Sequence, residues 1–254
     1  LYDKQNRPAL TLDHIETSLS WLSIALMEPR LSTLTIHQPQ LTVRREANGT
    51  IYVAGISMNE TGKVDFPNWL LRQSEINVLD ATVLWLDDLR HAPPLMLNKL
   101  DLQVQSPAWK SFIGHHLIGM HATPSAGSSQ PIDLRASIYG RNLDQINNWH
   151  GTLYAKLEGT DISAWGNWIP YPFDLREGYG AARFWLNFAK GRVQSVTSDV
   201  ILSKVVTRLS KTSAEARLNN LSGRLKWTLF SDGHEVNAEH IKVSTPDGLD
   251  MHNG

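Results

Sequence analysis

The chain has 254 residues, of which 41% are hydrophobic and 19% are charged, and its 24 Lys and Arg against 25 Asp and Glu give a formal net charge of −1. This balance argues against a nucleic-acid-binding domain, which normally carries a basic face. The hydrophobic content is sufficient for a folded core, so global disorder is excluded. The sequence contains no Cys, which excludes disulfides, thiolate-bound metals and thiol nucleophiles.

The ends of the sequence indicate a piece of a longer protein. No stretch approaches the ~20 apolar residues of a membrane-spanning helix. The chain begins at Leu1 without an initiator Met. We therefore expect any leader or membrane anchor to lie outside this chain.

Alternation of apolar and polar residues, which is typical of half-buried β-strands, dominates the sequence. It occurs in residues 34–36, 41–43, 51–53, 76–78, 81–85, 100–104, 132–138, 153–157, 182–188 and 225–229. Turn signals separate several of these runs, at Asn48-Gly49, Lys190-Gly191 and Asp232-Gly233. Strands joined by such short turns pair antiparallel. The sequence therefore predicts a mainly β fold built as an antiparallel meander.

A few short helices are expected between the strands. Pro67 suits the first turn of a helix, and Asp161 suits the N-cap of a helical turn that contains Trp165. Residues 143–149 are a third helical candidate, whereas residues 1–30 fit either a helix or strands.

One segment is rich in Ser, Gly and Pro and predicts a loop at residues 122–131. It divides the chain into an N-terminal β segment, residues 1–121, and a second β segment, residues 132–254, that continues the first.

Motifs of common enzymes are absent from the sequence: it has no G-x-S-x-G elbow, no P-loop and no H-E-x-x-H. His115, His116 and His121 form the best metal candidate, but no carboxylate stands at ligand spacing, so we interpret them as polar residues of a strand end and loop. The acidic pair 87–88 precedes Arg90, and a hairpin turn with a local Asp–Arg pair fits it better than a glycosidase dyad. We predict no enzymatic activity, no cofactor and no bound metal.

Several segments resemble a known family. Residues 31–43, which read Leu-x-x-Leu-x-Ile-x-x-Pro-x-Leu-x-Val, resemble the strand–turn–strand repeat of AsmA-like proteins. More specific segments follow in order: Ile-Tyr-Val-Ala-Gly-Ile at 51–56, Asn-Trp-Leu-Leu-Arg-Gln at 68–73, Ile-x-Val-x-Asp-Ala-x-Val-x-Trp-x-Asp at 76–87, Trp-His-Gly-Thr-Leu-Tyr-Ala at 149–155 and Asp-Ile-Ser-Ala-Trp at 161–165. This succession resembles the YhdP family, very large bacterial AsmA-like proteins.

The resemblance implies an open β groove in a protein of the periplasm of a Gram-negative bacterium. It implies anchoring in the inner membrane by a segment outside this chain, and a part in moving phospholipid toward the outer membrane. The implied partners are phospholipid acyl chains, the remainder of the same long polypeptide and other envelope proteins. The family is not known for enzymatic activity.

A sheet of alternating strands has one apolar and one polar face, and an apolar face without a covering layer is able to shield acyl chains. The candidate groove residues follow one phase of the alternation: Leu34, Ile36, Leu41, Val43, Ile51, Val53, Val83, Trp85, Leu102, Val104, Ile132, Leu134, Ile138, Phe184, Leu186 and Phe188. Two alternatives stay open. One is a structural or docking module with a sealed core, and the other is a sugar-binding β-sandwich that uses some of the nine Trp residues.

Overall fold

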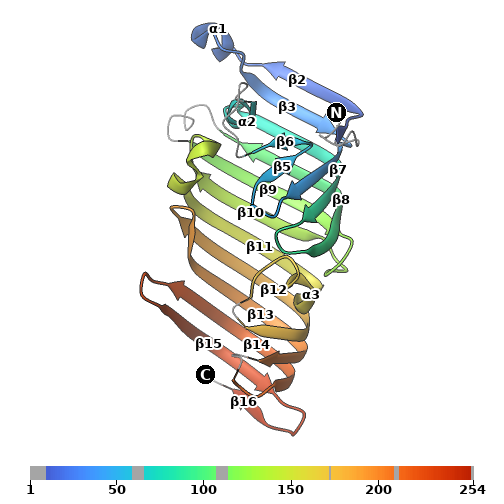
Figure 1. The fold of residues 1–254 in the computed structure, drawn as a ribbon, viewed down its shortest axis with the longest axis vertical. Helices are drawn as coiled ribbons and strands as arrows, with labels where there is room; N and C mark the ends of the chain where they lie inside the picture. Colours follow the sequence, from blue (N-terminus) through green and yellow to red (C-terminus); the bar gives the residue numbers. More distant parts are fainter. Residues whose placement is uncertain (1–9, 59–65, 107–113, 172, 209–211, 253–254) are drawn as a thin grey trace.

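The computed structural model describes residues 10–58, 66–106, 114–171, 173–208 and 212–252. These residues form a single open sheet of 16 strands. Figure 1 shows the strands stacked from β2 near the top to β16 at the bottom. The predicted mainly β fold is therefore confirmed.

The strands are short at the N-terminal edge and long in the centre. Those of the first half are β1 (Leu10–Thr11), β2 (His14–Leu19), β3 (Leu31–His37), β4 (Gln40–Arg45), β5 (Ile51–Val53), β6 (Ile56–Ser57), β7 (Glu75–Asp87), β8 (Ala92–Gln105) and β9 (His115–Pro124). Those of the second half are β10 (Ile132–Tyr139), β11 (His150–Asp161), β12 (Asp174–Ala189), β13 (Arg192–Arg208), β14 (Ala216–Leu229), β15 (His234–Ser244) and β16 (Asp250–His252).

The helices are short, as predicted. They are α1 (Leu22–Leu26), α2 (Phe66–Leu71), α3 (Ile162–Trp165) and the 3-10 helix η2 (Leu143–Asn148). Residues 1–30 were predicted to form either a helix or strands. The described part of this segment has both, namely the strands β1 and β2 followed by the helix α1.

The meander is antiparallel from β7 to β16, as predicted, but the sheet as a whole is mixed. β3 and β4 both pair in parallel with β7, along its first and second half respectively. The chain leaves β4 through β5, β6 and α2 before it returns as β7. This crossover brings β7 back in the same direction as β4, which a two-residue turn would not allow.

The predicted loop at residues 122–131 lies between β9 and β10, although β9 continues to Pro124. β9 and β10 pair directly over eight residues each, from Ile132 opposite Ala122 to Tyr139 opposite His115. Hydrogen bonding of the sheet is therefore continuous on both sides of this loop.

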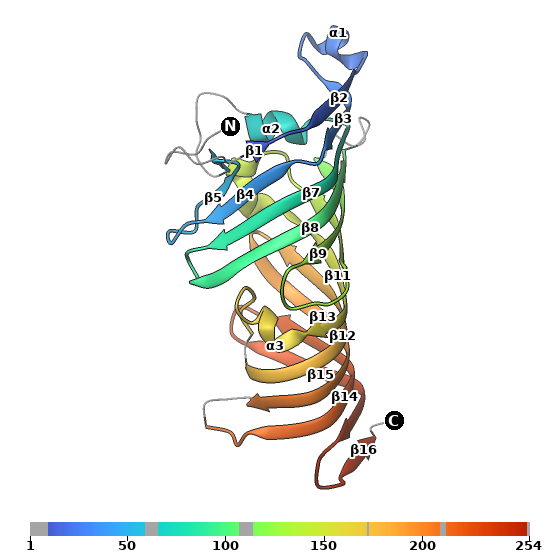
Figure 2. The same cartoon turned by 90° about the vertical axis from the view of Figure 1, so that its right-hand side faces the viewer.

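Bulges bend the strands. The register of β7 on β8 shifts next to Asp80 and Lys99, which have φ values of 52° and 48°. Similar shifts occur at Gly159 in β11 and opposite Lys204 in β13, with φ values of 54° and 52°. A bulge adds a residue to one strand and increases its bend and twist. The result is the curved profile of the sheet in Figure 2.

The convex face carries a row of charged side chains, beside some exposed apolar ones such as Ile201 and Met96. One row of cross-strand partners on it is mostly charged: Asp101, His121, Asp133, Lys156, Arg183, Asp199, Arg224 and Glu239. Acidic residues alternate with His or basic ones along most of this row, and opposite charges on facing strands are favourable. Arg224 forms a two-point pair with Asp199, with N–O distances of 2.6 and 2.8 Å.

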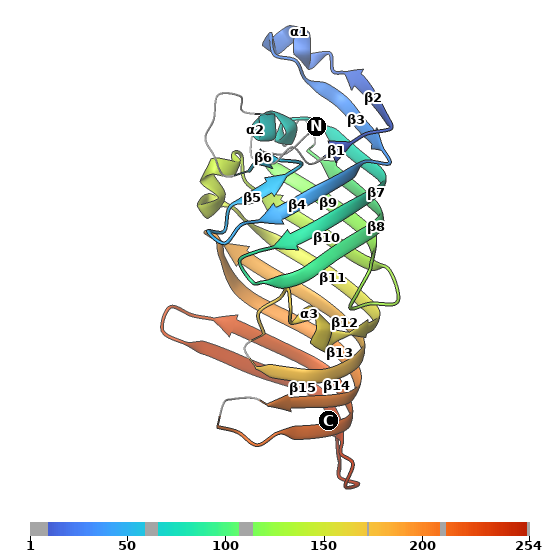
Figure 3. The same cartoon turned by 45° about the vertical axis from the view of Figure 1, so that its right-hand side comes forward.

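The hydrophobic core lies on the other, concave face. Figures 2 and 3 show α3 standing inside the curve of the sheet. Ile162 and Trp165 of α3 belong to one cluster of buried residues with Val83 of β7, Leu157 of β11 and Val200 of β13. A single short helix thus joins parts of the concave face that are distant in sequence.

Candidate functional site

The concave face carries all sixteen residues predicted for the groove. Direct cross-strand partners share a face of a sheet, as do residues two apart in a regular strand. The register pairs Leu41 with Val83 and Val43 with both Val53 and Trp85. Bulges interrupt this two-residue spacing in β7 and β8, but the residues on both sides of each bulge pack in the same hydrophobic cluster.

One row of partners crosses almost the whole sheet, and we call it the open row. It consists of Ile36, Val78, Leu102, Met120, Leu134, Ala155, Phe184, Ser198 and Leu225. Every one of these side chains is half-buried. The row continues to Ile15 in β2 and Ala238 in β15, both of which are exposed. The open row is therefore an apolar strip that the rest of the protein only partly covers.

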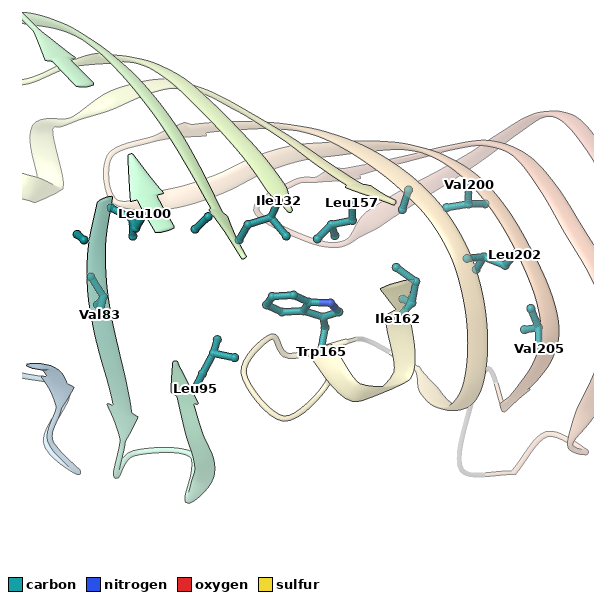
Figure 4. Packing of buried hydrophobic residues seen from close by; sticks show 13 residues of the cluster. Val83, Leu95, Leu100, Ile132, Leu157, Ile162, Trp165, Val200, Leu202 and Val205 are labelled. Carbon is teal, nitrogen blue, oxygen red and sulfur yellow. The ribbon is translucent and has the colours of Figure 1, made fainter. Parts of the chain in front are cut away.

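A second row lies two residues along the same strands, and we call it the sealed row. It consists of Ala122, Ile132, Leu157, Ala182 and Val200, none of which is more than 8% exposed. Figure 4 shows Trp165 beneath Ile132 and Leu157, on the inner side of the arch. α3 therefore covers the sealed row, whereas the open row stays half-buried.

Burial divides the predicted groove residues. Leu34, Val83 and Ile132 are buried, at 8%, 8% and 5% exposure. The other thirteen are half-buried. The concave face thus contains both buried and half-buried residues, and the two kinds occupy different positions along a strand.

α3 stands where two strands of the sheet are short. β9 ends at Pro124 and β10 begins at Ile132, whereas the neighbouring β8 extends beyond the end of β9. The loop after β9 closes this notch, because the backbone N–H of Ser125 donates to the carbonyl of Met96 in β8. α3 lies at this notch, on the concave side of the sheet (Figures 2 and 3).

The N-terminal end of α3 is fixed by a network of side chains. As predicted, Asp161 is the N-cap, and its side chain accepts hydrogen bonds from the backbone N–H groups of Ser163 and Ala164. The indole Nε1 of Trp165 donates to Oγ1 of Thr160 at 2.9 Å. Thr160, which is fully buried, donates in turn to the carbonyl of Gly127 at 2.5 Å. These bonds hold the Trp165 ring against the sealed row.

The C-terminal end of α3 is fixed to the β7–β8 hairpin. The Arg90 guanidinium donates to the carbonyls of Gly166 and Asn167, both at 3.1 Å. The indole of Trp168 donates to the carbonyl of Pro93 at 3.1 Å. The Tyr171 hydroxyl donates to the carbonyl of Ile162 at 2.8 Å, and burial raises the pKa of Tyr171.

The predicted hairpin turn at residues 87–88 is present, but its ion pairs have other partners. Asp87, buried at 3% exposure, pairs with Arg45, and Asp88 pairs with Arg44 at 2.6 Å. Arg90 donates only its backbone N–H to Asp87, because its side chain is turned toward α3. The pairing is thus across strands, since β4 runs alongside the end of β7.

The three His residues do not gather at one point. His116 hydrogen-bonds Oγ of Ser106 at 2.6 Å and the carbonyl of Gly140 at 2.9 Å, and burial lowers its pKa. His115 stacks on Tyr139. His121 lies opposite Asp133 in the register of β9 on β10, in the charged convex row. Within the described residues, no group of three or more His, Asp or Glu side chains is arranged to hold a metal ion.

Several residues of the concave face were not among those predicted from the sequence. They include Val78, Met120, Leu153, Leu157, Val196, Trp227 and, on α3, Trp165. Leu153 and Leu157 lie in the alternating run at residues 153–157, so the sequence carried a signal for placing them on this face. Trp165 has no such signal, because its position depends on how the notch folds.

Comparison with known proteins identifies the family. The family model described as YhdP protein matches residues 1–254, the whole chain. Searches of the curated proteins and of the solved structures find no significant match. No helix among the described residues is long and apolar enough to cross a membrane. The match over the full length shows that the chain belongs to the YhdP family of AsmA-like bacterial envelope proteins.

Proposed function

We propose that this chain is a segment of a groove-type conduit that moves phospholipids between the inner and outer membranes across the periplasm. The observation that carries the proposal is the half-buried open row on the concave face, opposite a charged convex face. A sheet with this division keeps hydrocarbon on its inner side while its outer side meets water.

The concave face suits hydrocarbon for a second reason. The backbone groups of the central strands already bond to neighbouring strands, so the face has few donors or acceptors left to satisfy. An acyl chain requires none. Covering apolar surface contributes about 25 cal/mol per Å², so a continuous apolar strip avoids the cost of exposing the tail to water.

The proposed transfer needs no chemical step by this chain. A passive strip lowers the barrier for movement but supplies no direction, so direction must come from other parts of the envelope machinery. The remainder of the same polypeptide, with an inner-membrane anchor outside this chain, and other envelope proteins are the proposed partners.

A structural or docking module is the second candidate, because the sealed row with α3 forms a well-buried core. The two functions differ in what they require of the open row. A conduit needs an apolar open row to bind lipid, whereas a structural module needs it only for packing.

The test compares two neighbouring residues of β12 that point to opposite faces. Leu186 is half-buried on the concave face, two residues from Phe184 of the open row, whereas Asn187 is exposed on the convex face. The chain is purified without delipidation, and bound phospholipid is measured by native mass spectrometry. We expect Leu186→Glu to lose most of the bound lipid and Asn187→Glu to retain it. Wild-type chain without any bound lipid would contradict the proposal.

Unfolding would mimic loss of binding, so the thermal unfolding of both variants is compared by circular dichroism. A folded Leu186→Glu chain with undiminished lipid would favour the structural module.

A further inference from the structure

We infer that α3 is the end-stop of an acyl-chain site, and that Trp165 and Ile162 determine how long a tail the concave face accepts. The inference rests on the proposed function, because it concerns the same surface. It adds an orientation, in which the tails lie along the strands and point from the β12–β13 turn toward α3.

The first argument is the change in burial along single strands. In β12, Phe184 is half-buried but Ala182 is 1% exposed. In β10, Leu134 is half-buried but Ile132 is buried. The change occurs at the same level in both strands, and the side chains of α3 belong to the cluster that produces it. The partly open surface therefore ends at a wall.

The second argument is the length of the open surface. From Phe188 to Phe184, half-buried apolar residues alternate along β12 over four residues, which is ~14 Å at ~3.4 Å per residue. One leaflet of a bilayer has a hydrocarbon thickness of ~15 Å. The distance from the turn to the wall thus matches the hydrocarbon depth of one leaflet.

The third argument is the positive charge at the end of β12 that is farther from α3. The β12–β13 turn presents two exposed cations, Lys190 and Arg192. This turn is held in place, because the Lys190 N–H donates to the carbonyl of Trp149 at 3.0 Å. A Cβ added at Gly191 would lie 2.9 Å from Oδ1 of Asn147 in η2. Cations beside an apolar strip complement a phosphate attached to acyl chains, which identifies the occupant as a phospholipid.

The fourth argument is that α3 is held from both ends. At its start, Asp161 caps the helix and the Tyr171 hydroxyl donates to the carbonyl of Ile162. At its end, Thr160 holds the Trp165 ring and Arg90 holds the carbonyls after the helix. A helix fixed in this way acts as a stop of constant position. It would shift only if these contacts broke.

The test measures tail-length preference. Wild-type chain, Trp165→Ala and Trp185→Ala are each incubated with an equimolar mixture of phosphatidylglycerols whose saturated tails have 12 to 18 carbons. The bound lipids are then quantified by native mass spectrometry. Trp185 is the matched control, because it lies on the convex face opposite Tyr154. We expect Trp165→Ala to favour longer tails, by about fourfold for each additional methylene that becomes buried, and Trp185→Ala to match the wild type.

Each result has a distinct meaning. Lipid binding with the same tail preference in wild type and Trp165→Ala overturns the end-stop but leaves the proposed function intact. No lipid bound by the wild type or by Trp185→Ala overturns both. If Trp165→Ala does not fold, Ile162→Ala tests the same wall and is expected to shift the preference in the same direction.

A measurement on the unaltered chain gives an independent test. Phosphatidylglycerol with a photoreactive diazirine at the tail end is bound and irradiated, and the labelled residues are mapped by mass spectrometry. Labels at Ile162 and Trp165 are expected. Labels concentrated instead at Lys190 and Arg192 would overturn the proposed orientation.

Discussion

The open row and the sealed row are two residues apart on the same strands, yet they differ in burial and in their proposed roles. Leu134 and Ile132 have similar side chains, the same strand and the same face, but only Ile132 is buried. What separates them is α3, a helix of four residues. Alternation along a strand therefore determines which residues face inward, and a small insertion determines which of those become core.

The comparison also shows where stability resides. Burial of apolar side chains stabilises the fold in proportion to the area removed from water. The sealed row provides this burial, whereas the open row leaves part of its apolar area in contact with solvent. The open row thus leaves mostly apolar side chains partly exposed on nine neighbouring strands, which is the feature that a binding surface for hydrocarbon requires.

The largest expected effect is that of a charge placed in each region. Val83 is buried in the same cluster as α3 and the sealed row, and Val196 is half-buried on the concave face, two residues from Ser198 of the open row. Val83→Asp leaves a carboxylate without a partner in the core and is expected to cost about 3–5 kcal/mol of the free energy of unfolding. Val196→Asp is expected to cost about 1 kcal/mol, because water reaches its side chain.

Urea denaturation of both variants checks this difference. Equal losses of stability would show that the buried cluster and the half-buried part of the concave face are packed alike, and the distinction between them would then fail.

A smaller loss of stability is expected at acidic pH, and it separates a buried carboxylate from a half-buried one. Burial by itself raises the pKa of Asp87, but hydrogen bonds from the Arg45 side chain and the Arg90 backbone outweigh it and lower the pKa below its ordinary 3.8. A depressed pKa in the folded state contributes stability at higher pH. This contribution is lost as the pH falls below about 4, toward the folded pKa.

The Asp87→Asn variant is expected to lose about 2 kcal/mol at neutral pH, because Arg45 keeps only part of its pairing. It is also expected to show a weaker decline in stability between pH 5 and about 2 than the wild type. Asp199 is the control on the convex face, where the hydrogen bond from Arg224 lowers its pKa. A larger loss for Asp199→Asn than for Asp87→Asn would reverse the expected ranking.

Much of the fold could be predicted from the sequence, because its signals are local. Alternation identified parts of β10, β11, β12 and β14, and Asp161 identified the start of α3. The parallel pairing of β7 with β3 and β4 could not be predicted, because it depends on where the chain returns after α2. The true partner of Asp87 was missed for the same reason.

The candidate site could be predicted only in part. The alternation phase placed residues such as Leu102 and Phe184 together on the concave face. It could not distinguish Leu134 from Ile132, because the cover over Ile132 comes from Trp165, which follows 33 residues later in the sequence. Burial of a sheet face is decided by such distant contacts, and period-2 patterns carry no information on them.

A third and smaller effect tests the contact that keeps the sealed row closed. Thr160→Val keeps the shape of the side chain but removes the hydroxyl between Trp165 and Gly127. The buried indole N–H of Trp165 then lacks its acceptor, and we expect a loss of about 1–2 kcal/mol. Hydrogen exchange should become faster at Ile162 to Trp165. Thr152→Val is the control, because Thr152 is exposed on the convex face, and it should leave the exchange of α3 unchanged.

The smallest effect concerns the bulges that bend the strands. Lys204 adopts a φ of 52° between Ser203 and the buried Val205. This conformation costs a residue with a Cβ roughly 1 kcal/mol, a cost that glycine avoids. Lys204→Gly is therefore expected to leave stability unchanged or raise it by up to about 1 kcal/mol, whereas the same change at Lys226, in the regular part of β14, should lower it by about 0.5–1 kcal/mol.

Thermal unfolding measures both changes. A clear loss for Lys204→Gly would mean that the Lys side chain itself holds the bend, whereas unchanged stability would mean that the packing of Val205 and its neighbours fixes the bend of β13.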